Sequence, residues 1–265
     1  MEQLKHTYTK SELKIYDYIR HNNQNVLYHS LTEISEASGV AEATVLRFFR
    51  KLGFKGFQDF KFLLAQELSQ SYHPEGEETF VEKVKNNIIE AINGSFEIIR
   101  LEALKAIIDT IDNFNDIIIF GIGSSGIAAL DMQNRLMRIG KHTTVISDPH
   151  FQIMRASTMD ENTVVIAISL TGSTKDIVDA VKIAKENQAI IIALTSYVKS
   201  PLTKYADLVL LSSAKENPLD SGSLISKISQ LYLIDIICTG LTMKNYDKAK
   251  KIKMKISENT SSKLY

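Results

Sequence analysis

The chain has 265 residues, of which 44% are hydrophobic and 23% are charged, the balance of a globular protein of one or two domains. Basic and acidic residues number 31 each, so the formal net charge is zero, which argues against a protein that coats nucleic acid over its whole surface. The single cysteine, Cys238, excludes an intramolecular disulfide, the N-terminus lacks an apolar signal core, and no uncharged apolar run approaches the roughly 18 residues that span a bilayer, so we expect a cytoplasmic protein without a membrane anchor.

Residues 1–72 are predicted to form short helices and no strand. Gly39 lies between two helical stretches, and a glycine tolerates the positive φ that a steep turn between helices needs. Ile34, Val40, Val45 and Phe48 fall where the inner faces of such a pair would meet. These features predict a helix-turn-helix DNA-binding domain over residues 1–72, with the second helix in the major groove of double-stranded DNA.

The face of the second helix that the core positions leave free is polar. Residues 42–63 hold five basic and two acidic side chains, a net charge of +3, at the place where DNA phosphates would run. The alternative interpretation is a three-helix packing module with solvated charges. The predicted DNA-contacting residues are Glu42, Thr44, Arg47, Arg50, Lys51 and Lys55.

The stretch from Gly39 to Lys61, GVAEATVLRFFRKLGFKGFQDFK, resembles the signature of the MurR/RpiR transcription regulators. One position departs from the family pattern, because Ala41 stands at the expected N-cap of the second helix where the family usually has serine. Loss of a serine N-cap typically removes about 1 kcal/mol of helix stability. Glu42 still favours the helix N-terminus through the helix dipole.

A linker is predicted at residues 73–78, where proline, glycine and three acidic residues occur together. The following stretch, Phe80 to Asn113, has apolar residues at helical spacing, such as Val84, Ile88 and Ile92. We expect Asn93 to Ser95 to divide it into two helices.

From residue 116 onward, short apolar strands alternate with helical segments. The predicted strands are residues 117–120, 143–146, 163–168, 190–194 and 208–211, and the predicted helices are residues 127–139, 175–186, 202–205 and 224–243. Strands that are apolar at every position are buried on both faces, as in a parallel sheet. The predicted fold class is therefore α + α/β, with an all-helical N-terminal domain and a doubly wound parallel-sheet domain, of the flavodoxin-like type, over residues 79–243. Residues 244–265 are expected to form a lysine-rich, solvated terminal helix, with a DNA-contacting arm as the alternative.

Two strand-to-helix turns combine glycine with hydroxyl side chains. Helix N-termini present unpaired N–H groups suited to an anion, and glycine allows the close approach of the backbone. Only Lys175 is cationic here, so neutral donors would hold a phosphate. The predicted sugar-phosphate residues are Gly123, Ser124, Ser125, Ser169, Thr171, Gly172, Ser173 and Thr174.

The first turn also spells the dinucleotide fingerprint G-x-G-x-x-G at Gly121, Gly123 and Gly126. Asp148 lies near the end of the next strand, where an acid would bind a ribose. A regulator that responds to NAD is therefore an alternative. The second turn favours a sugar phosphate instead, because a nicotinamide site has no need of Ser-x-Thr-Gly-x-Thr.

Together the two turns resemble the sugar isomerase (SIS) domain. Its first loop reads G-x-G-x-S, and its second reads S-x-S-G-x-T, in which Thr171 replaces a serine here. The final apolar helix also resembles that family, with Lys227 where arginine is common. The resemblance implies a phosphorylated sugar as effector and pairing of subunits into a homodimer or tetramer. The two recognition helices of a dimer would then face a roughly palindromic operator.

An enzyme is the remaining alternative, a sugar-phosphate isomerase with an appended helical domain. Proton transfer between sugar carbons needs a base, and Glu216 is the carboxylate that we would nominate, although its charged neighbours favour an exposed loop. His150 and Asp148 are placed to contact a sugar. The histidines show no metal-ligand spacing. We expect no catalytic residue, no metal and no cofactor, and a regulator of carbohydrate metabolism.

Overall fold

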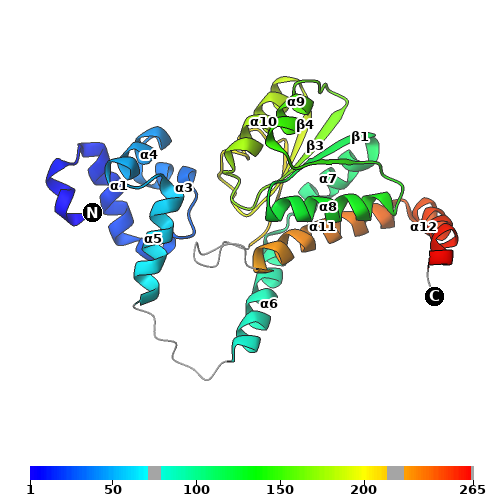
Figure 1. The fold of residues 1–265 in the computed structure, drawn as a ribbon, viewed down its shortest axis with the longest axis horizontal. Coiled ribbons are helices and arrows are strands. Elements are labelled where there is room, and N and C mark those ends of the chain that lie inside the picture. The colour runs from blue at the N-terminus through cyan, green and yellow to red at the C-terminus, as the bar shows by residue number, and fades with distance from the viewer. Residues whose placement is uncertain (71–78, 214–223, 264–265) are drawn as a thin grey trace. The chain divides into compact units, whose positions relative to one another are not determined.

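The computed structural model describes residues 1–70, 79–213 and 224–263. The described residues divide into two compact units, one from Met1 to Val84 and the other made of Lys85 to Ser213 together with the residues from Leu224 onward (Figure 1). The predicted linker at residues 73–78 and the nominated base Glu216 lie outside the described residues.

The first unit is all-helical. Its elements are η1 (Glu2–Thr7), α1 (Lys10–His21), α2 (Asn23–Val26), α3 (Leu31–Ser38), α4 (Glu42–Lys51) and α5 (Phe57–Gln70). The helices α1 and α3 both begin with a capping box, in which a Ser or Thr side chain and a Glu three residues later satisfy each other's backbone N–H groups. Gly39 ends α3 with φ of 64°, as the predicted turn requires.

A single core holds these helices together. Ile15 and Tyr16 from α1 meet Ile34 from α3 and Phe48 and Phe49 from α4, and all five side chains are buried. The four residues predicted to lie between the two helices are all buried in this core, namely Ile34, Val40, Val45 and Phe48. The predicted helix-turn-helix fold is thereby confirmed.

The stretch after residue 79 differs from the prediction. It forms α6 (Phe80–Ile98) and α7 (Leu101–Asn113), and α6 runs without interruption through Asn93 to Ser95. Gly94 allows close approach to another segment, since a Cβ there would lie 2.8 Å from the Ser213 hydroxyl oxygen. Ser95 is buried and accepts a hydrogen bond from the Ser213 backbone N–H. The glycine thus serves packing inside a helix.

The second unit contains a five-stranded parallel sheet. Its strands are β1 (Asp116–Phe120), β2 (Thr144–Ile146), β3 (Thr163–Ile168), β4 (Ile190–Thr195) and β5 (Leu208–Leu211), in the order β2-β1-β3-β4-β5. This order is flavodoxin-like, and it places the reversal of strand order between β1 and β3. The predicted doubly wound sheet is therefore confirmed.

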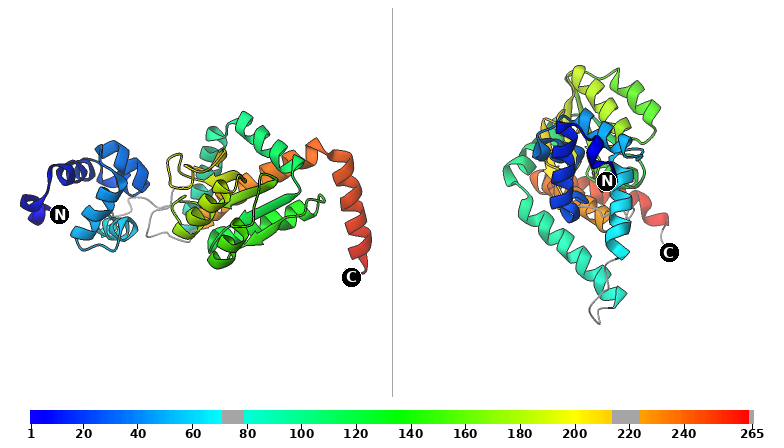
Figure 2. Two further views of the ribbon diagram at one scale, coloured as in Figure 1. Left: turned by 90° about the horizontal axis from the view of Figure 1, so that it is seen from above. Right: turned by 90° about the vertical axis from the view of Figure 1, so that its left-hand side faces the viewer.

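Helices cover both faces of the sheet (Figures 1 and 2). The remaining helices are α8 (Ser124–Met137), α9 (Pro149–Ala156), α10 (Lys175–Glu186), α11 (Leu224–Lys244) and α12 (Tyr246–Thr260), followed by η3 (Ser261–Lys263). One core joins the sheet to α7, α8 and α11, and a second core joins it to α9 and α10. The predicted helix at residues 202–205 is instead a turn, in which the Leu202 N–H donates to the carbonyl of Gly172.

The helix α11 is long and apolar enough, by length and composition, to cross a membrane. No segment of this kind is predicted from the sequence. The apolar character of α11 has another use in this fold. The helix contacts α7, α8 and β4, and Leu233, Ile237 and Leu241 are buried against them. The composition of α11 is therefore that of a core helix.

Candidate functional site

The helix α4 begins without a side-chain cap. Ala41 is its N-cap residue and makes no capping hydrogen bond, in line with the departure seen in the sequence. The Thr32 hydroxyl, from α3, donates a hydrogen bond of 2.6 Å to the Glu42 carboxylate. This contact fixes the first turn of α4 against α3.

The predicted DNA-contacting residues differ in their exposure to solvent. Arg47, Arg50 and Lys55 are exposed, whereas Glu42 and Thr44 are half-buried. The Arg47 guanidinium donates to the Thr44 hydroxyl over 3.0 Å, so these two side chains lie together on one face of α4. That face presents an arginine backed by a hydroxyl, a combination suited to phosphates and base edges.

Lys51 is also exposed, but its ammonium is occupied within the domain. It donates to the Glu12 carboxylate and to the Thr7 carbonyl, each over 2.8 Å, and lies over the Tyr8 ring. Lys61, also counted as basic in the sequence, is only 3% exposed and donates to the His29 carbonyl. The free positive charge beside α4 is therefore smaller than the sequence indicates.

The two glycine- and hydroxyl-rich loops meet at one edge of the sheet. They follow β1 and β3, which are adjacent and parallel, with Phe120 paired to Ala167 at the ends of the strands. Ligands in open α/β sheets bind outside the carboxyl ends of the strands where the strand order reverses. Both predicted loops stand at this point.

The first loop is shaped by its glycines. Gly123 is the N-cap of α8 and has φ of 59°, a conformation that side chains disfavour. A Cβ at Gly121 would lie 2.6 Å from the Ser125 carbonyl oxygen, and one at Gly126 would lie 3.1 Å from that of Gly121. The glycines therefore let the strand end and the first turn of α8 approach each other closely.

The second loop is braced by the strand beside it. Gly172 has φ of 59°, and a Cβ there would overlap the Ser200 side chain. The Thr195 hydroxyl donates to the Leu170 carbonyl over 3.0 Å, and the Ser169 and Thr174 hydroxyls lie 3.3 Å apart. The loop is thus held by β4 and by its own hydroxyl groups.

Both helices that start at these loops lack a side-chain cap. Neither Gly123 before α8 nor Thr174 before α10 supplies a side-chain capping hydrogen bond, although the Gly126 N–H in the first turn of α8 donates to the Gly123 carbonyl. The other N–H groups of a helix N-terminus without a side-chain cap are suited to binding an anion. Lys175 is paired with Asp179 one turn further along α10, which raises the pKa of its ammonium. An anion here would be held by neutral donors and the helix dipoles.

Gln230 is a residue of this site that the sequence did not reveal. Buried on α11, it donates from Nε2 to the Ser125 hydroxyl oxygen over 3.0 Å. Because that bond uses an acceptor position of the hydroxyl, the Ser125 proton is directed elsewhere. No local pattern links two residues that are more than a hundred positions apart.

The other nominated residues have structural roles or are exposed. The Asp148 carboxylate accepts a hydrogen bond from the Phe151 N–H and caps α9. His150 is exposed beside Phe151. Within the described residues, no group of three or more potential ligands could hold a metal ion.

The comparisons with known proteins match both halves of the chain. Residues 1–71 match the helix-turn-helix domain of the rpiR family, and residues 111–239 match the SIS domain. An HTH-type transcriptional regulator of Clostridium perfringens is 36% identical, over 96% of this chain and 95% of that protein. The HTH-type transcriptional regulator HexR of Escherichia coli is 30% identical, over 98% of this chain and 94% of that protein. The solved structure of Vibrio vulnificus NanR complexed with ManNAc-6P is similar with a TM-score of 0.89 at 27% identity, over 97% of this chain and 95% of that one.

Proposed function

The chain belongs to the HTH-type transcriptional regulators that join an rpiR-family helix-turn-helix domain to a SIS domain, and from this membership we propose that a phosphorylated sugar, bound at the two loops, controls its binding to DNA. The observation that carries the proposal is the convergence of two uncapped helix N-termini beside β1 and β3. NanR, complexed with ManNAc-6P, supports the class of ligand.

In this proposal Ser124, Ser125, Thr171, Ser173 and Thr174 donate to the phosphate through hydroxyl and backbone N–H groups. Ser169 positions Thr174, and the glycines at 123 and 172 hold the backbone conformation. A phosphate held mainly by neutral donors, with Lys175 paired to Asp179, is consistent with the reversible binding that a sensor requires. The sugar can shift the DNA equilibrium only by its differential affinity for the two states, typically about 1–3 kcal/mol.

On the DNA side, Arg47 and Arg50, with Lys55 beyond the helix, are proposed to contact phosphates and base edges, together with Thr44. Glu42 and Lys51 are proposed to act by positioning α4, since both are bonded within the domain. We further propose a cytoplasmic homodimer or tetramer that binds a roughly palindromic operator.

The test is fluorescence anisotropy of a labelled fragment of the gene's own upstream DNA, at fixed salt, with and without a panel of sugar phosphates that includes ManNAc-6P. We expect saturable binding that one sugar phosphate changes. The variant Ser124→Asp places a carboxylate in the first loop and should abolish that response while DNA binding is retained. Asn134→Asp, which adds the same charge further along α8 at another exposed position, is the matched control.

The same preparation distinguishes the two alternatives. Turnover of sugar phosphates, lost in Glu216→Gln, would establish an isomerase. Thermal protection by NAD and by no sugar phosphate would establish a nucleotide-responsive regulator. DNA binding that is indifferent to the whole panel would contradict control by a sugar phosphate.

A further inference from the structure

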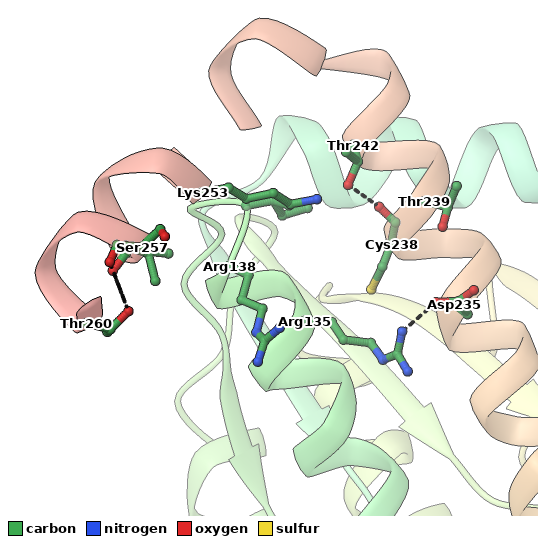
Figure 3. Close-up of a pocket in the computed structure, with 11 residues that line it drawn as sticks. Arg135, Arg138, Asp235, Cys238, Thr239, Thr242, Lys253, Ser257 and Thr260 are labelled. Carbon is green, nitrogen blue, oxygen red and sulfur yellow. Dashed lines mark hydrogen bonds and ion pairs between the residues drawn. The ribbon is translucent and has the colours of Figure 1, made fainter. Parts of the chain in front are cut away.

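A groove lies between α8, α11 and α12, a region that the proposed function does not use (Figure 3). Its volume is about 660 Å³, within the range of roughly 300–1,000 Å³ that is typical of small-molecule sites. It is lined by the last turn of α8, by Asp235 to Thr242 of α11 and by Lys253 to Thr260 of α12. The two-loop site is at the other end of α8, where Ser124 begins the helix.

The third wall of the groove is anchored to the domain. Asn245, the N-cap of α12, donates to the Asp112 carboxylate over 2.8 Å, and Lys244 forms an ion pair with Asp109. Ala249 is buried, and the Ile252 side chain packs directly against Gly140. The first half of α12 is therefore fixed, and it holds the second half over the groove.

The charge of the lining is unbalanced. Arg135 donates to Asp131 and to Asp235, the one acidic residue among those that line the groove. Arg138 and Lys253 also line it, and within the described part of the chain neither side chain forms an ion pair. Two cations are therefore available to a negatively charged ligand.

The remaining lining combines apolar surface with free hydroxyl groups. Ile139 and Ile256 supply apolar contacts, and the Thr239 and Ser257 hydroxyls form no hydrogen bond within the described residues. Burial raises the pKa of Cys238 to about 12, so its thiol stays neutral and does not repel an anion. Such a surface suits an organic molecule with acidic groups at one end.

We propose that this groove is a second binding site, which takes a small organic anion whose phosphate or carboxylate group is bound by Arg138 and Lys253. The apolar part of that ligand contacts Ile139 and Ile256. The inference stands independently of the proposed function, because none of these residues belongs to the two-loop site or to the DNA-binding face.

Phenyl phosphate is the probe, since it joins a doubly charged group to an apolar ring and has no sugar hydroxyls. Calorimetric titration is made on the full chain carrying Ser124→Asp, so that the two-loop site does not bind it. We expect binding that weakens at least about tenfold when Arg138→Gln and Lys253→Gln are added. Adding Lys251→Gln and Lys255→Gln, exposed lysines of the same helix outside the groove, should change affinity by less than about twofold.

Equal losses in both double variants would overturn the proposal, because they would show general attraction to a basic helix. Backbone amide shifts in the wild-type chain give a second readout that is independent of variant folding. Shifts at Thr239, Thr242 and Ser257 on titration support the site, and a titration that shifts only amides outside the groove, such as those of the two-loop site, contradicts it. Dissociation of an oligomer by Arg138→Gln and Lys253→Gln, with no probe binding, would identify the groove as a subunit interface and also overturn the proposal.

Discussion

Lys51 Nζ lies 2.8 Å from Glu12 Oε2, so the C-terminal end of α4 is fastened to the first turn of α1. The same ammonium also reaches the Thr7 carbonyl. A lysine that the sequence places among the DNA contacts therefore holds the C-terminal end of α4 against α1.

The ion pair predicts an acid-sensitive contribution to stability. Partial burial opposes the charge of Glu12, but hydrogen bonds from Lys51 and Thr9 outweigh it and lower the pKa of the carboxyl group. With a folded-state pKa below the unfolded value, the stabilisation is complete above the unfolded value and is lost as pH falls through the folded one. Glu12→Gln should destabilise the domain by at most about 1 kcal/mol at neutral pH, since Lys51 is partly exposed.

Urea unfolding measured from neutral to acidic pH checks this expectation. The difference between wild type and Glu12→Gln should shrink in acid. Glu67→Gln, which alters an exposed carboxylate on α5, is the control. A difference that is constant over the whole pH range would contradict an electrostatic origin.

The uncapped start of α4 predicts a stabilising substitution. Ala41→Ser restores a side chain able to accept a hydrogen bond from the first turn, and should raise the free energy of unfolding by about 0.5–2 kcal/mol. Ala43→Ser, an exposed position one residue inside the helix, offers no cap and should be neutral or slightly destabilising. The measurement is chemical unfolding of the two variants, and equal effects would refute a capping role for residue 41.

Among the predicted DNA-contacting residues, Arg47 is expected to contribute most to the affinity for DNA. Its exposed guanidinium lies beside Thr44 on the free face of α4, so Arg47→Ala should weaken operator binding by about 1–3 kcal/mol. Binding isotherms at several salt concentrations separate its roles, because loss of a phosphate contact reduces the salt slope by about one unit. Lys14→Ala, an exposed position on α1, is the comparison, and an equal loss there would show that only net charge matters.

The bond from Gln230 to Ser125 predicts a selective loss of effector binding. Gln230→Glu preserves shape but replaces a donor by an acceptor, which would draw the Ser125 proton away from a bound phosphate. We expect about a tenfold or larger loss of sugar-phosphate affinity with DNA binding unchanged in the absence of effector. Gln133→Glu is the control, because that glutamine, on the same domain, donates only to the Thr143 carbonyl. Equal effects of the two variants on effector affinity would rule out the proposed role of Gln230.

The strands and both loops were predictable because their signals are local. In the run of residues 163–168 every position after Thr163 is apolar, and all six residues are buried. The glycines at 39, 123 and 172 have positive φ, a conformation that favours glycine, so the residue type itself indicates the turn.

The predictions that the structure corrects concern residues whose conformation or charge depends on a contact with a residue distant in sequence. Asn93 to Ser95 continues a helix because Ser213 packs against Gly94, and the segment at 202–205 is a turn because its first N–H bonds to Gly172. Lys51 is occupied by Glu12 on another helix, and Lys61 is buried against a carbonyl. Composition reports that a residue is basic, whereas only the fold decides whether its charge is free.

The bracing of Gly172 by Ser200 has a consequence for how such a site diversifies. The anion would be held largely by backbone N–H groups, which substitution of side chains leaves in place, while the loop itself has no room for a side chain at residue 172. Changes in the preferred sugar are therefore expected from side chains at other positions around this end of the sheet and not from residue 172. Recognition of the phosphate and discrimination among sugars are in this way separable, and one scaffold can acquire a new effector without losing its hold on the phosphate.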